Sequence, residues 1–200
     1  MSEGSVLPQK FAALFVDVPN IEHWCTQEGG SHQFPFSEIR WDVLVERMLS
    51  SLGADHYIYV GNVYLFAGNG RKHTIDWLEK GMKHGLGRYR KEVTVNVRSG
   101  KDIDVMMVND IWECFVGMLH EQERREIEPP LEVTILVAGG DGAYSYPIKS
   151  LRALVPNMVN LRLHTFTWSG NLSGELSRLS EYVELLDKMG PSILSTQLVH

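Results

Sequence analysis

The chain has 200 residues, 44% of them hydrophobic, and a formal net charge of −6. This size and apolar content suffice for one sizeable core, so we expect a single domain over residues 11–190 with flexible tails at 1–10 and 191–200. No stretch approaches the ~20 consecutive apolar residues of a membrane span, and residues 1–10 lack the features of a signal peptide, which argues against a membrane or secreted protein and favours an intracellular, cytoplasmic one.

The first predicted element is a strand over residues 11–17, an unbroken apolar run that stops at Asp17. Such a run is typical of a strand buried on both faces, and Pro19 ends it because proline cannot continue the pairing. Ligands of open parallel α/β sheets bind at the carboxyl ends of strands, so Asp17 is a candidate site residue. Its alternative role is to cap the next segment. Asn20 is expected to reach the same pocket or to brace the Asp17 carboxylate.

Helices and strands then alternate along the chain. Residues 21–35 are polar, contain glycine and predict a long loop. Cys25 and Cys114 lie far apart and form no CxxC pair, so we expect neither a disulfide framework nor a structural zinc site. The elements expected up to residue 97 are a helix at 37–52 with Ser37 as N-cap, strands at 56–60 and 63–66, a helix at 73–83 and a strand at 92–97.

Positive charge is concentrated between Arg71 and Lys101. Nine basic residues stand there against three acidic ones, a local balance of +6 that leaves −12 for the rest of the chain. Lys and Arg bind nucleic acid by neutralising phosphates and releasing counterions, so this segment is a candidate phosphate-binding face. An ordinary solvated helix face is the alternative. The candidate contacts are Arg71, Lys72, Arg88, Arg90, Lys91 and Arg98.

The segment 99–112 begins with turn residues and passes into a helix that we expect to end near His120. Asp102 or Asp104 falls in its first turn, where an acid caps free amides and complements the helix dipole. The functional alternative is that Asp104 projects toward Asp17. Asp110 lies about 240° around the helix from Asp104, so the two cannot point the same way, and Asp110 is the weaker ligand candidate.

A second buried strand, at 133–138, follows a charged connector at 121–130 and ends in Gly-Gly-Asp-Gly, which places Asp141 at another strand end. Glycines on both sides allow a sharp turn and a close approach of substrate. A helix at 146–154, a strand at 160–166 and a helix at 173–188 complete the pattern. This alternation predicts a three-layer α/β/α sandwich with a mainly parallel central sheet.

Three segments, FVDVPN, KDIDVMMVND and VAGGDGAY, resemble in this order the motifs of NYN-type nucleases of the PIN-like superfamily. Those proteins are similar in carrying a first strand that ends in Asp-x-x-Asn, a Lys-x-Val-Asp-Val segment that opens a helix, and a strand that ends in Ser-Gly-Asp-x-Asp-Phe. The segment NLSGELSRLSEYVELL also resembles the family's last helix. The resemblance spans about residues 11–188 and implies a PIN-like, Rossmannoid fold.

The resemblance implies a metal-dependent endoribonuclease, in which aspartates hold Mg²⁺ or Mn²⁺ and water attacks a phosphodiester bond of RNA. Such hard cations take oxygen ligands, and a bound ion lowers the pKa of the attacking water and neutralises charge on the phosphorane. Carried over onto this chain, the metal carboxylates are Asp17, Asp104 and Asp141, with Asn20 as the supporting amide, Asp110 as an accessory acid and Lys101 near the scissile phosphate.

The chain departs from the family's third motif at three positions. Ala143 stands where the family has a second Asp, Tyr144 where it has Phe, and Gly139 where it has Ser. Losing a carboxylate weakens metal recruitment, so a catalytically weakened RNA-binding or regulatory module is the alternative function. A nucleotide-binding enzyme that uses residues 139–142 as a phosphate loop is least favoured, because no Lys-Ser/Thr pair follows. RNA is the expected partner, a homodimer is compatible with the sequence, and no membrane association is expected.

Overall fold

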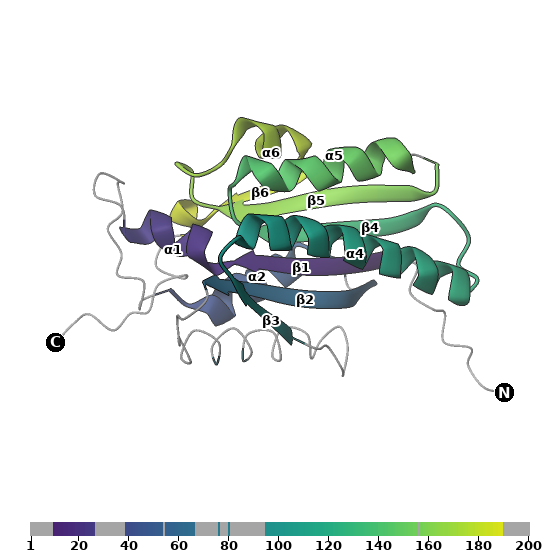
Figure 1. Ribbon diagram of the computed structural model, residues 1–200, viewed down its shortest axis with the longest axis horizontal. Helices are drawn as coiled ribbons and strands as arrows, with labels where there is room; N and C mark the ends of the chain where they lie inside the picture. The colour runs from purple at the N-terminus through teal and green to yellow at the C-terminus, as the bar shows by residue number, and fades with distance from the viewer. Residues whose placement is uncertain are drawn as a thin grey trace.

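The computed structural model describes residues 10–26, 39–53, 55–66, 95–155 and 157–189, together with Asp76 and Lys80. Its centre is a six-stranded sheet in the order β3-β2-β1-β4-β5-β6, in which every neighbouring pair of strands is parallel. Helices lie on both faces of the sheet (Figure 1). The predicted three-layer α/β/α sandwich is therefore confirmed.

Strands and helices alternate along the chain. In chain order they are β1 (Lys10–Asp17), α1 (Val18–Thr26), α2 (Trp41–Ser50), β2 (His56–Phe66), β3 (Val95–Gly100), α4 (Ile103–Arg124), β4 (Leu131–Ala138), the 3₁₀ turn η2 (Gly142–Tyr144), α5 (Ser145–Leu154), β5 (Val159–Thr167), α6 (Gly174–Leu179), β6 (Tyr182–Leu185) and the 3₁₀ turn η3 (Leu186–Lys188). The predictions for β1, β4, α5 and β5 are correct to within two residues. No helix in the described part of the chain is long and apolar enough to cross a membrane.

The core lies on both sides of the sheet because successive side chains of a strand point to opposite faces. In β1, Phe11 and Phe15 pack on the side of α4 and α5, whereas Leu14 and Val16 pack on the side of α2. All four side chains are fully buried. A strand that is apolar on both faces is what two helical layers require, and this explains the unbroken hydrophobic run.

The long loop predicted at 21–35 is wrong over its first part. Helix α1 begins at Val18, directly after β1, and extends to Thr26; residues 27–35 lie outside the described part. Pro19 is the second residue of this helix, where its fixed φ fits and its missing N–H costs nothing. Val18 and Ile21 are buried and attach the helix to the core. The proline thus ends the strand and also starts a helix.

The boundaries of four other elements differ from expectation. β2 is one continuous strand through Gly61 and Asn62, because it pairs with β1 on one side and β3 on the other. β3 occupies 95–100, so the expected turn at Ser99 and Gly100 is instead strand. α2 begins at Trp41 and α4 continues to Arg124. Ser37 lies outside the described residues, as does the helix expected at 73–83 apart from Asp76 and Lys80, which are helical.

The single C-terminal helix predicted at 173–188 is also wrong. Ser173 caps a short helix, α6, by accepting a hydrogen bond from the Leu176 amide, and this helix ends at Leu179. The chain then forms β6, which pairs in parallel with β5. An open edge of β5 offers unpaired backbone groups to Tyr182–Leu185, and the ladder that results overrides the helical spacing of apolar residues.

Candidate functional site

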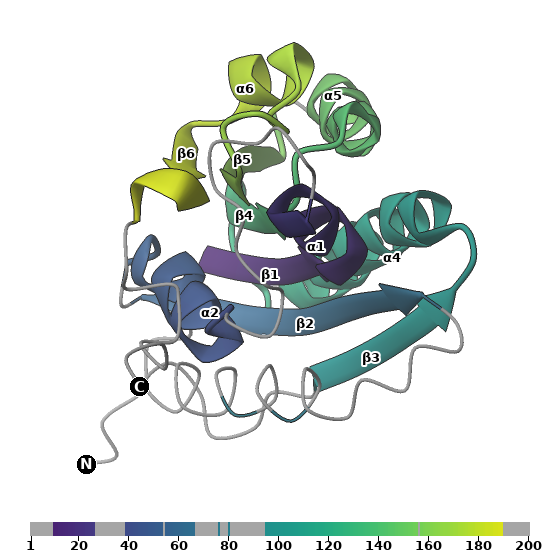
Figure 2. The same ribbon diagram turned by 90° about the vertical axis from the view of Figure 1, so that its left-hand side faces the viewer.

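The sheet order creates a crevice at the carboxyl ends of β1 and β4. The chain runs from β1 outward to β2 and β3, then crosses through α4 to β4 on the other side of β1. Such a switch in direction is where open α/β sheets bind ligands. Figure 2 looks onto this edge, with α1 in front of β1. A cavity of about 350 Å³ lies here, lined by Asp17, Pro19, Asn20, His23, Lys101, Asp102, Ile103, Asp104, Val105 and Asp141.

Asp17, the last residue of β1, is the most deeply placed acid of this cavity and is only 2% exposed. Its Oδ1 accepts a hydrogen bond of 3.1 Å from the Asn20 backbone N–H, and its Oδ2 accepts one from the Tyr144 hydroxyl. Burial raises the pKa of Asp17 to about 6, helped by the negative charges of Asp104 and Asp141 and opposed by the two hydrogen bonds. The surroundings of this carboxyl therefore favour either its protonated form or a cation beside its negative charge.

The Tyr144 hydroxyl joins two of the predicted carboxylates. Besides Asp17, it donates to Oδ1 of Asp104 at 2.9 Å. Burial and the two acids raise the pKa of Tyr144, so the phenol keeps its proton. A phenol has one proton to donate, so it satisfies one of the two carboxylates at a time. The resemblance predicted only an aromatic ring at this position. The contact could have been anticipated because a buried tyrosine hydroxyl needs a polar partner.

The Asn20 side chain does not brace Asp17; the backbone N–H of Asn20 does that. The amide oxygen accepts hydrogen bonds from Gly140 N at 2.9 Å and from Nδ2 of Asn171 at 2.5 Å. It thereby ties the first turn of α1 to the segments that follow β4 and β5. Asn171 is the first residue of the segment NLSGELSRLSEYVELL, but neither the resemblance nor its residue type predicted it as a site residue.

The turn after β4 depends on two glycines. Gly139 has φ +153°, a conformation that favours glycine, and a Cβ there would lie 3.0 Å from the Tyr144 ring. A Cβ on Gly140 would lie 2.3 Å from the Asn171 carbonyl oxygen. Asp141 follows in extended conformation and its Oδ1 accepts a 2.7 Å hydrogen bond from the Ala143 amide. Its carboxylate is thus fixed at the wall of the cavity.

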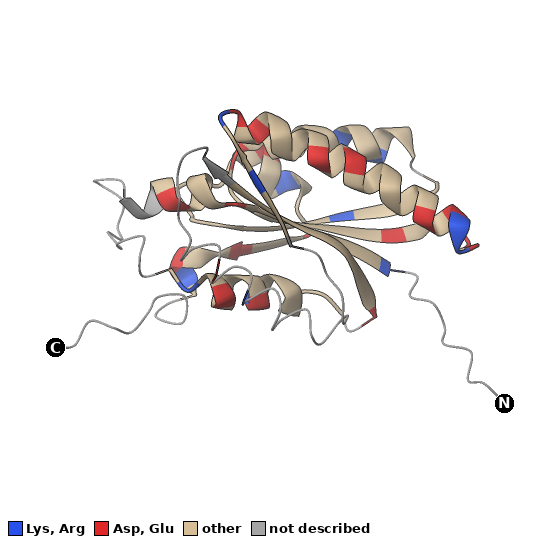
Figure 3. Cartoon of the chain, turned by 60° about the horizontal axis from the view of Figure 1, so that its bottom comes forward, with Lys and Arg blue, Asp and Glu red and all other residues tan. Residues whose placement is uncertain are grey.

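The start of α4 supplies another part of the cavity wall. Asp104 lies in the first turn of the helix and Lys101 just before it, and both line the cavity, as the sequence predicted. In Figure 3 the ribbon is coloured for acidic residues at this helix start and farther along α4. His23 lines the cavity from α1; its place was missed because that segment was expected to be a loop.

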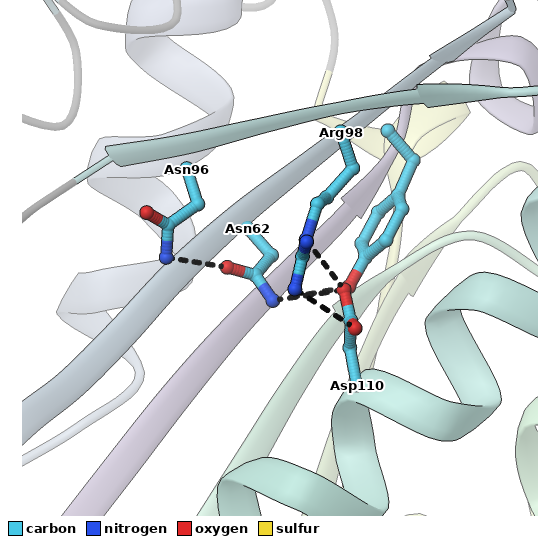
Figure 4. Close-up of polar contacts among 5 residues, drawn as sticks. Asn62, Asn96, Arg98 and Asp110 are labelled. Atoms are coloured by element: carbon cyan, nitrogen blue, oxygen red, sulfur yellow. Dashed lines mark hydrogen bonds and ion pairs between the residues drawn. The ribbon is translucent and has the colours of Figure 1, made fainter.

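Asp110 does not line the cavity, in agreement with its angle around α4. It lies beneath β2 and β3, where Arg98 donates to both of its oxygens at 3.1 and 3.2 Å and the Tyr64 hydroxyl donates at 2.9 Å (Figure 4). Asn62 bridges this pair to Asn96 through hydrogen bonds of 3.3 and 3.1 Å. The predicted accessory acid is therefore part of a partly buried polar network that joins α4 to the sheet.

The predicted RNA-binding residues are only partly described. The guanidinium of Arg98 is engaged by Asp110, although 46% of its side chain stays exposed. The other predicted contacts, Arg71, Lys72, Arg88, Arg90 and Lys91, lie outside the described residues.

The donor chemistry of the cavity fits a hard divalent cation. Within the described residues no three His, Cys, Asp or Glu side chains form a metal-binding group. Magnesium, however, is commonly held by one or two carboxylates with waters and substrate phosphates completing its shell. Asp17 and Asp104 come close enough to share one hydroxyl. These two are the residues that would hold such an ion, with Asp141 beside them.

Comparison with known proteins adds information on the fold alone. No family model matches the chain, and no curated protein matches it. A solved structure, that of VPA0982 from Vibrio parahaemolyticus, is similar with a TM-score of 0.52 and 15% sequence identity, covering 94% of this chain and 97% of that one. That protein is described as one of unknown function. The likeness supports the α/β/α architecture and leaves the resemblance to NYN-type nucleases a prediction.

Proposed function

We propose that this protein is a metal-dependent endoribonuclease of the NYN type that hydrolyses RNA in the cytoplasm. The observation that carries the proposal is the convergence of Asp17, Asp104 and Asp141, from β1, α4 and the turn after β4, on one cavity that Lys101 also lines. These residues are up to 124 positions apart, and both their places at strand or helix ends and the sequence resemblance had grouped them.

The residues of the cavity suit a phosphodiester substrate in distinct ways. Asp17 and Asp104 would hold Mg²⁺ or Mn²⁺, which when bound lowers the pKa of a water and neutralises phosphate charge. Without a cation, the acids of the cavity would repel a phosphate. Lys101 offers an exposed ammonium group to the phosphate. Asn20 keeps the turn after β4 in place and so positions Asp141.

The proposal predicts manganese-dependent cleavage of labelled single-stranded and hairpin RNA by the wild-type protein. Asp17→Asn and Asp141→Asn should each reduce the rate by at least about 100-fold, because losing a carboxylate weakens ion binding and its charge compensation. Glu123→Gln is the matched control, since Glu123 is an exposed acid at the far end of α4. Cleavage that survives EDTA or the Asp17 substitution would contradict the proposal.

A second function, RNA binding without turnover, is favoured by one specific observation. Ala143 is exposed at the site where the resemblance predicts a further carboxylate, and Tyr144 brings a hydroxyl into contact with two of the remaining acids. Silence of the wild-type protein in the cleavage assay, with activity appearing in Ala143→Asp, would identify a binding module derived from a nuclease. Activity in the wild type would exclude this alternative.

A further inference from the structure

Tyr144 does not line the cavity but contacts two acids that do, and the proposed nuclease gives it no role. Its hydroxyl lies between Oδ2 of Asp17 and Oδ1 of Asp104, one oxygen of each carboxylate that would hold the cation. The related motif carries Phe at this position, which has no proton to donate. The chain therefore puts an internal hydrogen-bond donor where a metal ion would need the same lone pairs.

The hydroxyl is held in this position by the packing of its ring. Tyr144 is 0% exposed. Its ring lies so close to Gly139 that a Cβ on residue 139 would be 3.0 Å from it. Its backbone N–H donates to the Asp141 carbonyl at 3.3 Å and so belongs to the same tight turn. The side chain cannot swing into solvent unless η2 also moves, so an incoming ion must break the hydrogen bonds of the hydroxyl in place.

We propose that Tyr144 sets the metal affinity of the site, its hydroxyl competing with the divalent cation for Asp17 and Asp104 and so weakening cation binding. This inference rests on the proposed metal site. A hydroxyl proton and a metal ion both need the lone pairs of these carboxylates, and a charge-assisted hydrogen bond is stronger than a neutral one. The protein without metal is then stabilised by the tyrosine, and the ion binds only by displacing it.

The direct test is Mn²⁺ binding to Tyr144→Phe and to the wild type, measured by electron paramagnetic resonance of the free ion. We expect the phenylalanine variant to bind Mn²⁺ roughly tenfold or more tightly, the scale set by losing a hydrogen bond to a charged group. Tyr64→Phe is the matched control, because its hydroxyl also donates to a buried carboxylate, that of Asp110, but away from the cavity. Tyr146→Phe, with an exposed hydroxyl two residues from Tyr144, is the second control.

The outcomes separate this inference from the proposed function. Equal or weaker Mn²⁺ binding by Tyr144→Phe would overturn the inference, as would the same gain in Tyr64→Phe. Tighter binding with no RNA cleavage by either protein would support the inference and reject the nuclease. Cleavage by the wild type, with the Mn²⁺ affinity of Tyr144→Phe unchanged, would support the nuclease and overturn the inference. Absence of Mn²⁺ binding in every protein would overturn both.

A measurement on the wild type covers the case in which Tyr144→Phe does not fold. Addition of Mg²⁺ should change the near-ultraviolet absorption of tyrosine, because the Tyr144 hydroxyl leaves its two carboxylates. Tyr146→Phe should show the same change, whereas Asp104→Asn, which lacks one of the two carboxylates, should not. A wild-type spectrum that is unaffected by saturating Mg²⁺ would count against displacement of the hydroxyl.

Discussion

Asp17 is the acid of the cavity whose surroundings disfavour its charged form. It is buried at the end of β1, faces two other acids and depends on Asn20 and Tyr144 for hydrogen bonds. In the folded protein its pKa is about 6, against an ordinary value of 3.8. The proton is thus bound more tightly in the folded than in the unfolded chain. Without a cation, this residue stabilises the fold most when protonated.

The stability of the metal-free protein should therefore depend on pH through Asp17. Between about pH 4 and pH 6 the folded state holds more protons than the unfolded state, so the free energy of unfolding falls as pH rises through this window, by roughly 3 kcal/mol when complete. Asp17→Asn should lose this component and be more stable than the wild type at pH 7.5. Urea unfolding in EDTA at pH 5 and pH 7.5 measures both effects.

The wild type and Asp17→Asn share all other titrating groups. The contributions of these groups therefore cancel in the difference between the two free energies of unfolding. Glu123→Gln, an exposed acid of α4, should keep the wild-type pH dependence. Identical pH dependence of wild type and Asp17→Asn would show that the Asp17 carboxyl is not destabilised by its surroundings.

At the scale of elements, the site is formed where connections meet rather than within any helix or strand. α1, the turn after β4 and the turn after β5 converge on the Asn20 amide, which accepts from Gly140 and Asn171. The close approach of the last two is possible only because residue 140 has no side chain. A change in this glycine should disturb the site through backbone displacement, although it touches no carboxylate.

Gly140→Ala should destabilise the protein by about 1–3 kcal/mol, the usual cost of forcing an extra methyl group into a packed region. Its Cβ would lie 2.3 Å from the Asn171 carbonyl oxygen and 2.6 Å from Oγ1 of Thr167. Thermal or urea unfolding measures this loss. Gly174→Ala is the matched control, because its Cβ would meet nothing within 4 Å, and in α6 alanine should be neutral or slightly favourable. Equal stability of the two variants would contradict the close approach.

For the whole molecule, the uneven distribution of charge matters more than its total. The net charge is −6, yet residues 71–101 carry +6. A phosphate can approach the acids of the cavity only when a cation is bound there, whereas a basic segment can bind RNA directly. RNA binding should thus depend on the basic segment, and turnover on the cavity.

Replacing Arg88, Arg90 and Lys91 with glutamine in one variant should weaken RNA binding. The slope of log affinity against log salt concentration should also fall in magnitude by up to about 3, because three phosphate contacts are lost. The matched control removes the same charge from exposed residues of α5, β5 and α6. These are Lys149, Arg162 and Arg178. Fluorescence anisotropy with a labelled RNA between 50 and 200 mM salt provides the measurement. An unchanged affinity in the basic-segment variant would locate RNA binding elsewhere.

The sequence by itself determined three strands of the sheet, β1, β4 and β5, and much of the cavity. Apolar runs bounded by Pro or Gly predicted β1 and β4, and the acids that follow these runs were placed at strand ends, because burial on two faces leaves a strong local signal. The three carboxylates do line one cavity. The angle of 240° around α4 also separated Asp110 from the cavity correctly.

Tertiary structure alone decided the contacts between distant segments. β6 is a strand because β5 had an open edge, and Asn171 joins the site because Gly140 lets the two turns meet. Tyr144 donates to Asp17, 127 residues away. Local periodicity reports which residues are buried and in what conformation, but which polar groups then face one another depends on how the elements pack.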